Sequence, residues 1–132
     1  MPKEILFSGR VTSGAGEGRH FMALQGYLDQ FMRVLGLKPY PGTLNIKLTP
    51  ESVPYLELLK HEKGIRVNGF AHDGKQFGGV SLFKASISGI GCTIAIPDKG
   101  RYTDVIEVVS DRNLRESMHL NDGDKIDLLV ML

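Results

Sequence analysis

The spacing of apolar residues along the chain changes between every second and every third or fourth position, which indicates both strands and helices. Alternation predicts about six or seven strands, at residues 4–11, 43–48, 65–70, 80–87, 90–96, 105–109 and 125–132. Helical spacing predicts an amphipathic helix whose core-facing stripe is Phe21, Leu24, Leu28, Phe31 and Leu35. Gly36 closes that helix, a second helix ends at about Lys60, and residues 113–120 suggest a third.

Short strands with one apolar face each favour a mainly β protein. Closing such strands into a small barrel removes the unpaired edges that an open sheet would leave, and a two-sheet sandwich is the structural alternative. The length of 132 residues fits one domain. We therefore expect a small closed barrel with two or three short helices.

Charge and cysteine usage narrow the class of protein. The net charge of +1 provides no overall field for nucleic acid or a membrane, so neither is expected as a partner. The single cysteine, Cys92, excludes an internal disulfide, and its neighbours Ile90 and Ile94 suggest a small buried hydrophobe. Without a signal-like N-terminus or a long apolar run, the chain is predicted to be soluble and cytoplasmic. The histidines lack zinc-ligand spacing, and we interpret all four as surface or packing residues: His20, His61, His72 and His119.

One strand begins with polar residues two positions apart. Thr43 and Asn45 point to the same side, while Leu44 and Ile46 take the other. A hydroxyl and an amide oxygen beside a triphosphate suit a hard ion such as Mg²⁺, and Mn²⁺ would fit the same ligands. The alternative is the polar outer face of a half-buried strand. Lys47 shares this parity and could reach a phosphate, although a solvated lysine is the simpler interpretation.

A glycine-rich segment stands between the first strand and the first helix. Glycines alternate there with other residues, and a basic residue follows: Gly14, Ala15, Gly16, Glu17, Gly18 and Arg19. Glycine lets backbone amides approach a phosphate, and the start of a helix adds unpaired N–H donors. The spacing matches neither the dinucleotide fingerprint nor the phosphate loop. A flexible loop is at least as good an interpretation as a phosphate cradle.

Glu107 is an isolated carboxylate within an apolar strand, on the same side as Val105 and Val109. It is either an outward-facing strand residue or an acid near a site. In a closed pocket, desolvation would favour its neutral form and so its acceptance of a proton from a substrate hydroxyl.

Two arginines follow that strand. Asp111 resembles a helix cap, and Arg112 and Arg115, three positions apart, would share one helix face. They could clamp a phosphate or a base edge, and the alternative is a solvated helix face.

In order and wording these segments closely resemble the archaeal CTP-dependent riboflavin kinases, over essentially the whole chain. The segments that carry the resemblance are Ser13-Gly14-Ala15-Gly16-Glu17-Gly18, Tyr27-Leu28-Asp29-Gln30-Phe31, Leu35-Gly36, Pro39-Tyr40-Pro41-Gly42-Thr43-Leu44-Asn45, Val105-Ile106-Glu107-Val108-Val109, Leu114-Arg115 and Asp122-Gly123-Asp124. Some members carry an additional N-terminal winged-helix domain. This chain starts directly at the barrel, so we expect one kinase domain over residues 1–132.

The resemblance implies a six-stranded barrel of the cradle-loop kind. It also implies transfer of a phosphoryl group from CTP to the 5′-hydroxyl of riboflavin, giving FMN and CDP, with CTP rather than ATP inherited wholly from the resemblance. By position, Thr43 and Asn45 would hold one Mg²⁺, and Glu107 would contact the ribityl end of the flavin and serve as the catalytic group. The nucleotide would be bound by residues 14–19 together with Arg112, Asn113, Leu114 and Arg115. We expect a monomer that binds only these small molecules.

The sequence departs from the family pattern at one point. Family members often carry a threonine shortly before the position of Arg101-Tyr102, as a flavin contact, and here Lys99-Gly100 stands there while Thr103 lies on the other side. A non-catalytic flavin or nucleotide sensor on the same barrel is therefore the rival hypothesis. A DNA-binding barrel is a third, and the near-zero net charge argues against it.

Overall fold

The computed structural model describes residues 4–13, 25–36, 38–40, 43–98 and 104–132. Within these ranges the chain is mainly β, as the alternation predicts. The strands are β1 (Glu4–Thr12), β2 (Leu44–Leu48), β3 (Ile65–Val67), β4 (Phe70–His72), β5 (Lys75–Phe77), β6 (Val80–Ile87), β7 (Ile90–Pro97), β8 (Val105–Val109) and β9 (Lys125–Met131). The helices are α2 (Gln25–Leu35), α3 (Val53–Lys60) and α4 (Leu114–Ser117). No described helix has the length and apolar character needed to cross a membrane.

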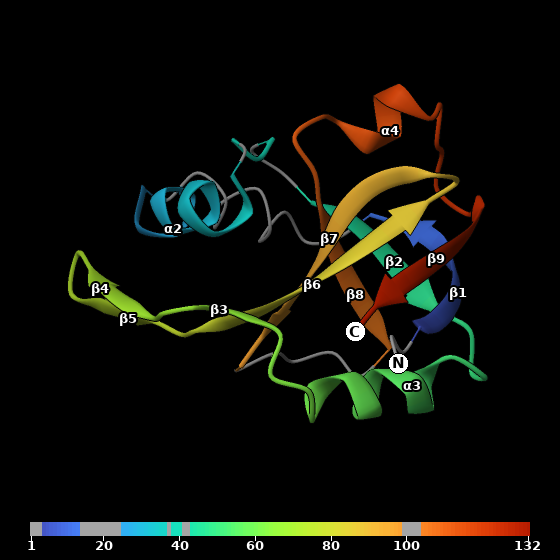
Figure 1. The fold of residues 1–132 in the computed structure, drawn as a ribbon. Coiled ribbons are helices and arrows are strands. Elements are labelled where there is room, and N and C mark those ends of the chain that lie inside the picture. Colours follow the sequence, from blue (N-terminus) through green and yellow to red (C-terminus); the bar gives the residue numbers. More distant parts are fainter. Residues whose placement is uncertain (1–3, 14–24, 37, 41–42, 99–103) are drawn as a thin grey trace.

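Six strands close into an antiparallel barrel, which confirms the predicted closed barrel over the sandwich (Figure 1). The order around the ring is β6-β7-β8-β2-β1-β9, and β9 returns to β6 through the pairs Ala85–Val130 and Ser86–Leu129. The inward-facing side chains form the barrel core, as the fully buried Ile94 and Val130 illustrate. Cys92 belongs to this core, and burial raises the pKa of its thiol to about 12. Its predicted role as a small buried hydrophobe is confirmed.

Helix α3 lies across one end of the barrel (Figure 1). Its side chains Leu56 and Leu59 are 2% and 0% exposed and pack into the barrel core. The buried Ser52 hydroxyl, just before the helix, accepts a hydrogen bond of 2.9 Å from the backbone N–H of Ser8 in β1. The helix is thus fixed to the strand that it covers.

A second apolar cluster lies outside the barrel wall, between α2 and the strands β3, β6, β7 and β8. This outer cluster consists of Tyr27, Phe31, Val67, Val80, Leu82, Ala95 and Val109. The paired strands β4 and β5 add Phe70 and Phe77, whose rings stack on each other and meet Tyr27 edge-on. The helix stripe therefore differs from its prediction. Tyr27 and Phe31 are the buried residues of α2, Leu28 and Leu35 are only partly buried, and Phe21 and Leu24 lie outside the described residues.

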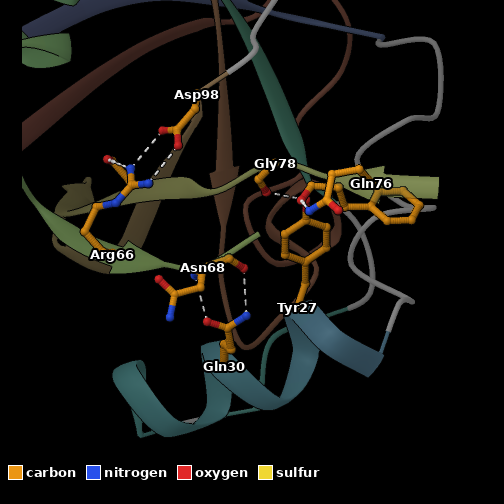
Figure 2. A network of polar contacts seen from close by, with 9 residues as sticks. Tyr27, Gln30, Arg66, Asn68, Gln76, Gly78 and Asp98 are labelled. Carbon is orange, nitrogen blue, oxygen red and sulfur yellow. Dashed lines mark hydrogen bonds and ion pairs between the residues drawn. The ribbon is translucent and has the colours of Figure 1, made fainter. Parts of the chain in front are cut away.

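A polar network joins α2 to the strands around it (Figure 2). The Tyr27 hydroxyl donates a hydrogen bond of 2.7 Å to the backbone oxygen of Gly78. Arg66 forms a two-bond fork to Asp98, with distances of 2.8 and 2.7 Å. This fork lowers the pKa of Asp98 below its usual range.

The same network explains why the alternating segment at residues 65–70 is not one strand. The side-chain amide of Gln30 takes both backbone groups of Asn68, accepting from its N–H at 2.8 Å and donating to its carbonyl at 2.9 Å (Figure 2). These groups are then unavailable to a strand ladder, so β3 ends at Val67 and β4 begins at Phe70.

Candidate active site

A row of residues from four strands crosses the outer face of the barrel wall. In the strand register, Thr12 of β1 lies opposite Asn45 of β2, Asn45 lies opposite Glu107 of β8, and Glu107 lies opposite Ala95 of β7. Asn45 and Glu107 are both half-buried, while their strand neighbours point into the barrel core. The structure therefore brings together an amide and a carboxylate that are far apart in sequence.

Thr43 completes this group from just outside the strand. Contrary to the prediction that the strand begins at Thr43, β2 begins at Leu44. The Thr43 side chain still reaches the row, because its hydroxyl donates a long hydrogen bond of 3.4 Å to Glu107 Oε1. A hydroxyl, an amide and a carboxylate thus face one region of the surface.

The donor chemistry of this region suits a hard cation. In the described part of the chain, no group of three or more His, Cys, Asp or Glu residues could hold a metal ion. An ion at this row would therefore use the neutral oxygens of Thr43 and Asn45, with Glu107 nearby, and leave other positions to phosphate or water. Mg²⁺ tolerates such an arrangement, since it is usually bound through few protein oxygens.

The two sides of Glu107 differ in character. On one side its cross-strand neighbour is the polar Asn45, which continues to Thr12. On the other side it is Ala95, which belongs to the outer cluster together with Val109. Glu107 therefore lies on the boundary between a polar strip and an apolar one.

The segment after β8 folds differently from its prediction. Helix α4 spans only Leu114–Ser117, and its N-cap is Asn113, whose side-chain oxygen accepts from the Glu116 N–H at 3.2 Å. The prediction that Asp111 caps this helix is therefore wrong. Its carboxylate is engaged by Ser110 and Arg112 instead, at 3.3 Å each.

The predicted pair of arginines on one helix face is also wrong, because Arg112 precedes α4 while Arg115 lies within it. Leu114 is 4% exposed and packs in the barrel core. Its side chain is therefore not available to a ligand.

Arg115 ties α4 to the end of β1. Its guanidinium lies 2.6 Å from Asp122 Oδ1 and donates a second, longer bond of 3.4 Å to the backbone oxygen of Thr12. The other oxygen of Asp122 accepts from the Ser13 hydroxyl at 2.7 Å. The hydrogen bond from Ser13, followed by that from Arg115, lowers the pKa of Asp122 below its usual range. This clamp holds the residue that immediately precedes Gly14; the predicted nucleotide residues 14–19 lie outside the described residues.

Tyr40 joins the same end of the barrel. Its backbone N–H donates to the Ser110 carbonyl at 2.7 Å, and its hydroxyl accepts from the Asn113 side-chain amide at 3.2 Å. The sequence interpretation treated Tyr40 only as part of a motif. The available signal was an aromatic residue between Pro39 and Pro41, three positions before Thr43.

The remaining candidates fall outside these contacts. Lys47 is exposed and lies opposite Arg10, which in turn lies opposite Lys125, so three cations form a second row beside the first. The exposed positions of the three described histidines confirm their interpretation as surface residues: His61, His72 and His119. His20 and residues 99–103 lie outside the described ranges.

Comparisons with known proteins find similarity over nearly the whole chain. Residues 11–130 match the model of the family CTP-dep_RFKase, described as "Domain of unknown function DUF120". The riboflavin kinase of Thermoplasma acidophilum is 44% identical to the chain over 130 residues, which are 98% of this chain and 59% of that protein.

Two further relatives are similar to the same extent. The riboflavin kinase of Archaeoglobus fulgidus is 41% identical over 129 residues, or 97% of this chain and 55% of that protein. The riboflavin kinase of Pyrobaculum aerophilum is also 41% identical over 129 residues, or 97% of this chain and 61% of that protein. The chain thus spans between 55% and 61% of the length of these three relatives.

Proposed function

The chain belongs to the family of CTP-dependent riboflavin kinases, and we propose that it transfers the γ-phosphate of CTP to the 5′-hydroxyl of riboflavin, giving FMN and CDP. The observation that carries this proposal is the strand register that sets Asn45 opposite Glu107, with the Thr43 hydroxyl 3.4 Å from the Glu107 carboxylate. Phosphoryl transfer depends more on positioning and charge neutralisation than on covalent chemistry by the protein. A compact group of oxygen ligands beside one carboxylate fits that requirement.

In this proposal Glu107 acts on the substrate hydroxyl. It orients the 5′-hydroxyl and accepts its proton as the new oxygen–phosphorus bond forms, while the bond between the γ-phosphorus and the β–γ bridging oxygen breaks. CDP leaves with the bridging oxygen, and Glu107 returns the proton to solvent. Thr43 and Asn45 are the residues that would hold Mg²⁺, or Mn²⁺ in its place, which neutralises phosphate charge when bound.

The polar side of Glu107 fits the reactive end of riboflavin. Riboflavin carries its reactive hydroxyl on a polar ribityl chain attached to a flat, largely apolar ring. The outer cluster begins at Ala95 on one side of Glu107, and the polar strip continues through Asn45 on the other. A polyol at Glu107 with the nucleotide towards Asn45 matches the polar side of this division, whereas the members of the outer cluster are at most 9% exposed and are occupied by packing against α2.

The contacts around α4 support a nucleotide site on the polar side. Arg115 is bonded to Asp122 and to the Thr12 carbonyl, and we propose residues 14–19, which follow Ser13 in the sequence, as the cradle for the phosphates. Arg112 is only partly shielded and would add charge, whereas Asn113 and Leu114 would contribute through position and backbone. We propose that the protein is cytoplasmic and that it acts as a monomer on its two small substrates.

A product assay tests the proposal directly. The purified chain, riboflavin and Mg²⁺ would be incubated with CTP, UTP, GTP or ATP, and FMN would be measured by chromatography. We expect FMN with CTP well above the other donors, and loss of that product in Asn45→Ala. FMN with ATP alone would keep the kinase and contradict the choice of CTP. Flavin binding with no FMN from any donor would contradict the kinase and favour the sensor.

A further inference from the structure

Two tyrosines of this chain occupy opposite environments. Tyr27 is 6% exposed, its ring contacts three other aromatic rings, and its hydroxyl is bonded to Gly78. Tyr40 is 37% exposed and belongs to neither apolar cluster, and no ring in the described part of the chain stacks on it. Packing thus explains why the Tyr27 ring lies where it does, but it does not explain the position of the Tyr40 ring.

Tyr40 is nevertheless held at both ends. Its backbone N–H is bonded to Ser110, directly after β8, and its hydroxyl is bonded to Asn113, the N-cap of α4. Fixing an exposed aromatic ring costs conformational entropy without the compensating burial that a core residue gains. A ring that is fixed and open at the same time is arranged as a binding surface.

The residues around Tyr40 indicate the kind of ligand. Asn113 also caps α4, and α4 carries Arg115, which donates to the backbone oxygen of Thr12 at the end of β1. On its other side Tyr40 is three residues from Thr43, so their Cα atoms lie no more than about 11 Å apart. A nucleoside triphosphate extends over a comparable length from its base to its last phosphate. A ligand with its phosphates at Thr43 is therefore long enough for its base to reach Tyr40.

We infer that the exposed ring of Tyr40 is the platform on which the nucleobase of the phosphate donor stacks, an inference that rests on the kinase function proposed above. A base stacks on an aromatic side chain through its π-face, an interaction common to nucleic-acid-binding sites. In this arrangement Asn113 is a positioning residue. One end of its amide caps the helix and the other holds the tyrosine hydroxyl, so that the ring is presented in one orientation.

The test separates the base from the phosphates. Calorimetry would measure the binding of CDP and of inorganic pyrophosphate, each with Mg²⁺, to the wild type, Tyr40→Leu and Tyr40→Phe. Stacking worth about 1–3 kcal/mol per base predicts a Kd for CDP that is roughly five- to 150-fold higher in Tyr40→Leu. Tyr40→Phe keeps the ring and should retain most of the affinity, and pyrophosphate should bind all three proteins equally.

Tyr55 offers a matched control. It is 46% exposed on α3, at the other end of the barrel, and Tyr55→Leu should bind CDP as the wild type does. Unchanged CDP binding in Tyr40→Leu would contradict the inference that Tyr40 stacks on the base. An equal loss of affinity for CDP and pyrophosphate would also contradict it, because Tyr40 would then act through the structure of the site. FMN production by the wild type would leave the proposed function standing in either case.

A second measurement needs no variant. The ring-proton resonances of Tyr40 in the wild type should shift when CDP is added and stay in place when pyrophosphate is added. A Tyr40 ring that does not respond to CDP at saturation would contradict the inference even if Tyr40→Leu failed to fold. Absence of both CDP binding and FMN production in the wild type would overturn the proposed function together with the platform.

Discussion

The two ends of the barrel are stabilised by different kinds of contact. At the α3 end, Leu56 and Leu59 are buried in the core, and the hydroxyl that anchors the helix, Ser52, is buried as well. At the α4 end, the helix is a single turn that buries only Leu114, and its side-chain contacts to neighbouring segments are polar and largely exposed, as in the bond between Arg115 and Asp122. The α3 end is held mainly by apolar packing, whereas the α4 end combines one buried leucine with exposed polar contacts.

This difference separates stability from ligand binding. Apolar burial provides most of the free energy of folding, and exposed polar contacts provide little. Exposed polar groups can, however, exchange their partners for those of a ligand without opening the core. A change at the α3 end should therefore alter the free energy of unfolding, and a change on the α4 side should alter activity or ligand binding.

The largest effect on activity is expected at Glu107, in the row of residues that crosses the outer face of the barrel wall. Glu107→Gln removes the proton acceptor of the proposed reaction and keeps the size of the side chain, so turnover should fall by about 10²- to 10⁴-fold. Riboflavin binding and the melting temperature should change little. The measurement is the steady-state rate from pH 5 to 9, together with flavin titration. An unchanged rate across this range would remove Glu107 from any acid–base role.

A change in the core beneath α3 should lower stability and leave turnover unchanged. Leu59 is 0% exposed, and Leu59→Ala should lower the free energy of unfolding by about 2–5 kcal/mol because it leaves a cavity in the core. The neighbouring Leu58 is 57% exposed, and Leu58→Ala should change that free energy by no more than about 0.5 kcal/mol. Urea unfolding measures both. A loss of turnover per folded molecule in Leu59→Ala would contradict the separation of the two ends.

A smaller effect is expected at Arg115. Arg115→Ala removes a charge-assisted contact from the proposed phosphate side, and such contacts are worth about 1.5–3 kcal/mol, so the KM for CTP should rise by roughly tenfold or more. The KM for riboflavin should not change. Arg33→Ala, in the last turn of α2, is the matched control. An effect confined to riboflavin would place Arg115 on the flavin side instead.

The smallest effect concerns pH. The pKa of Asp122 is lowered by Ser13 and Arg115, so its contribution to stability is complete above the ordinary aspartate value of about 4. It is lost as the pH falls through the lowered value. The stability difference between the wild type and Asp122→Asn should therefore shrink in urea titrations as the pH falls from 5 to 2. A difference that grew on acidification would reverse the sign of the assigned shift.

The barrel could be predicted from the sequence because strands with one apolar face leave few alternatives. The alternation around Ile46 and Ile106 identifies both inward faces, and the turn at Ser88-Gly89 is marked by glycine. Asp111 shows where local patterns are insufficient. Both Asp111 and Asn113 are good caps by residue type. In the structure Asn113 caps α4, while the Asp111 carboxylate accepts from Ser110 and Arg112.

The candidate site could be predicted only in part. Thr43 and Asn45 share a face by strand parity alone, but nothing local indicates that Glu107 lies opposite Asn45, because register between distant strands is set by the closed ring. Tyr27 was missed for a similar reason. Its burial depends on Phe70 and Phe77, which reach it from a later part of the chain.

The pairing of β1 with β9, from Glu4–Met131 to Arg10–Lys125, also determines how the molecule is made. The ring cannot close during synthesis until β9 has left the ribosome, so β1 has no β9 to pair with while the segments between them are made. Local hairpins such as β6–β7 are available much earlier. Folding should therefore be slow relative to helical proteins of this size, with barrel closure as its late step.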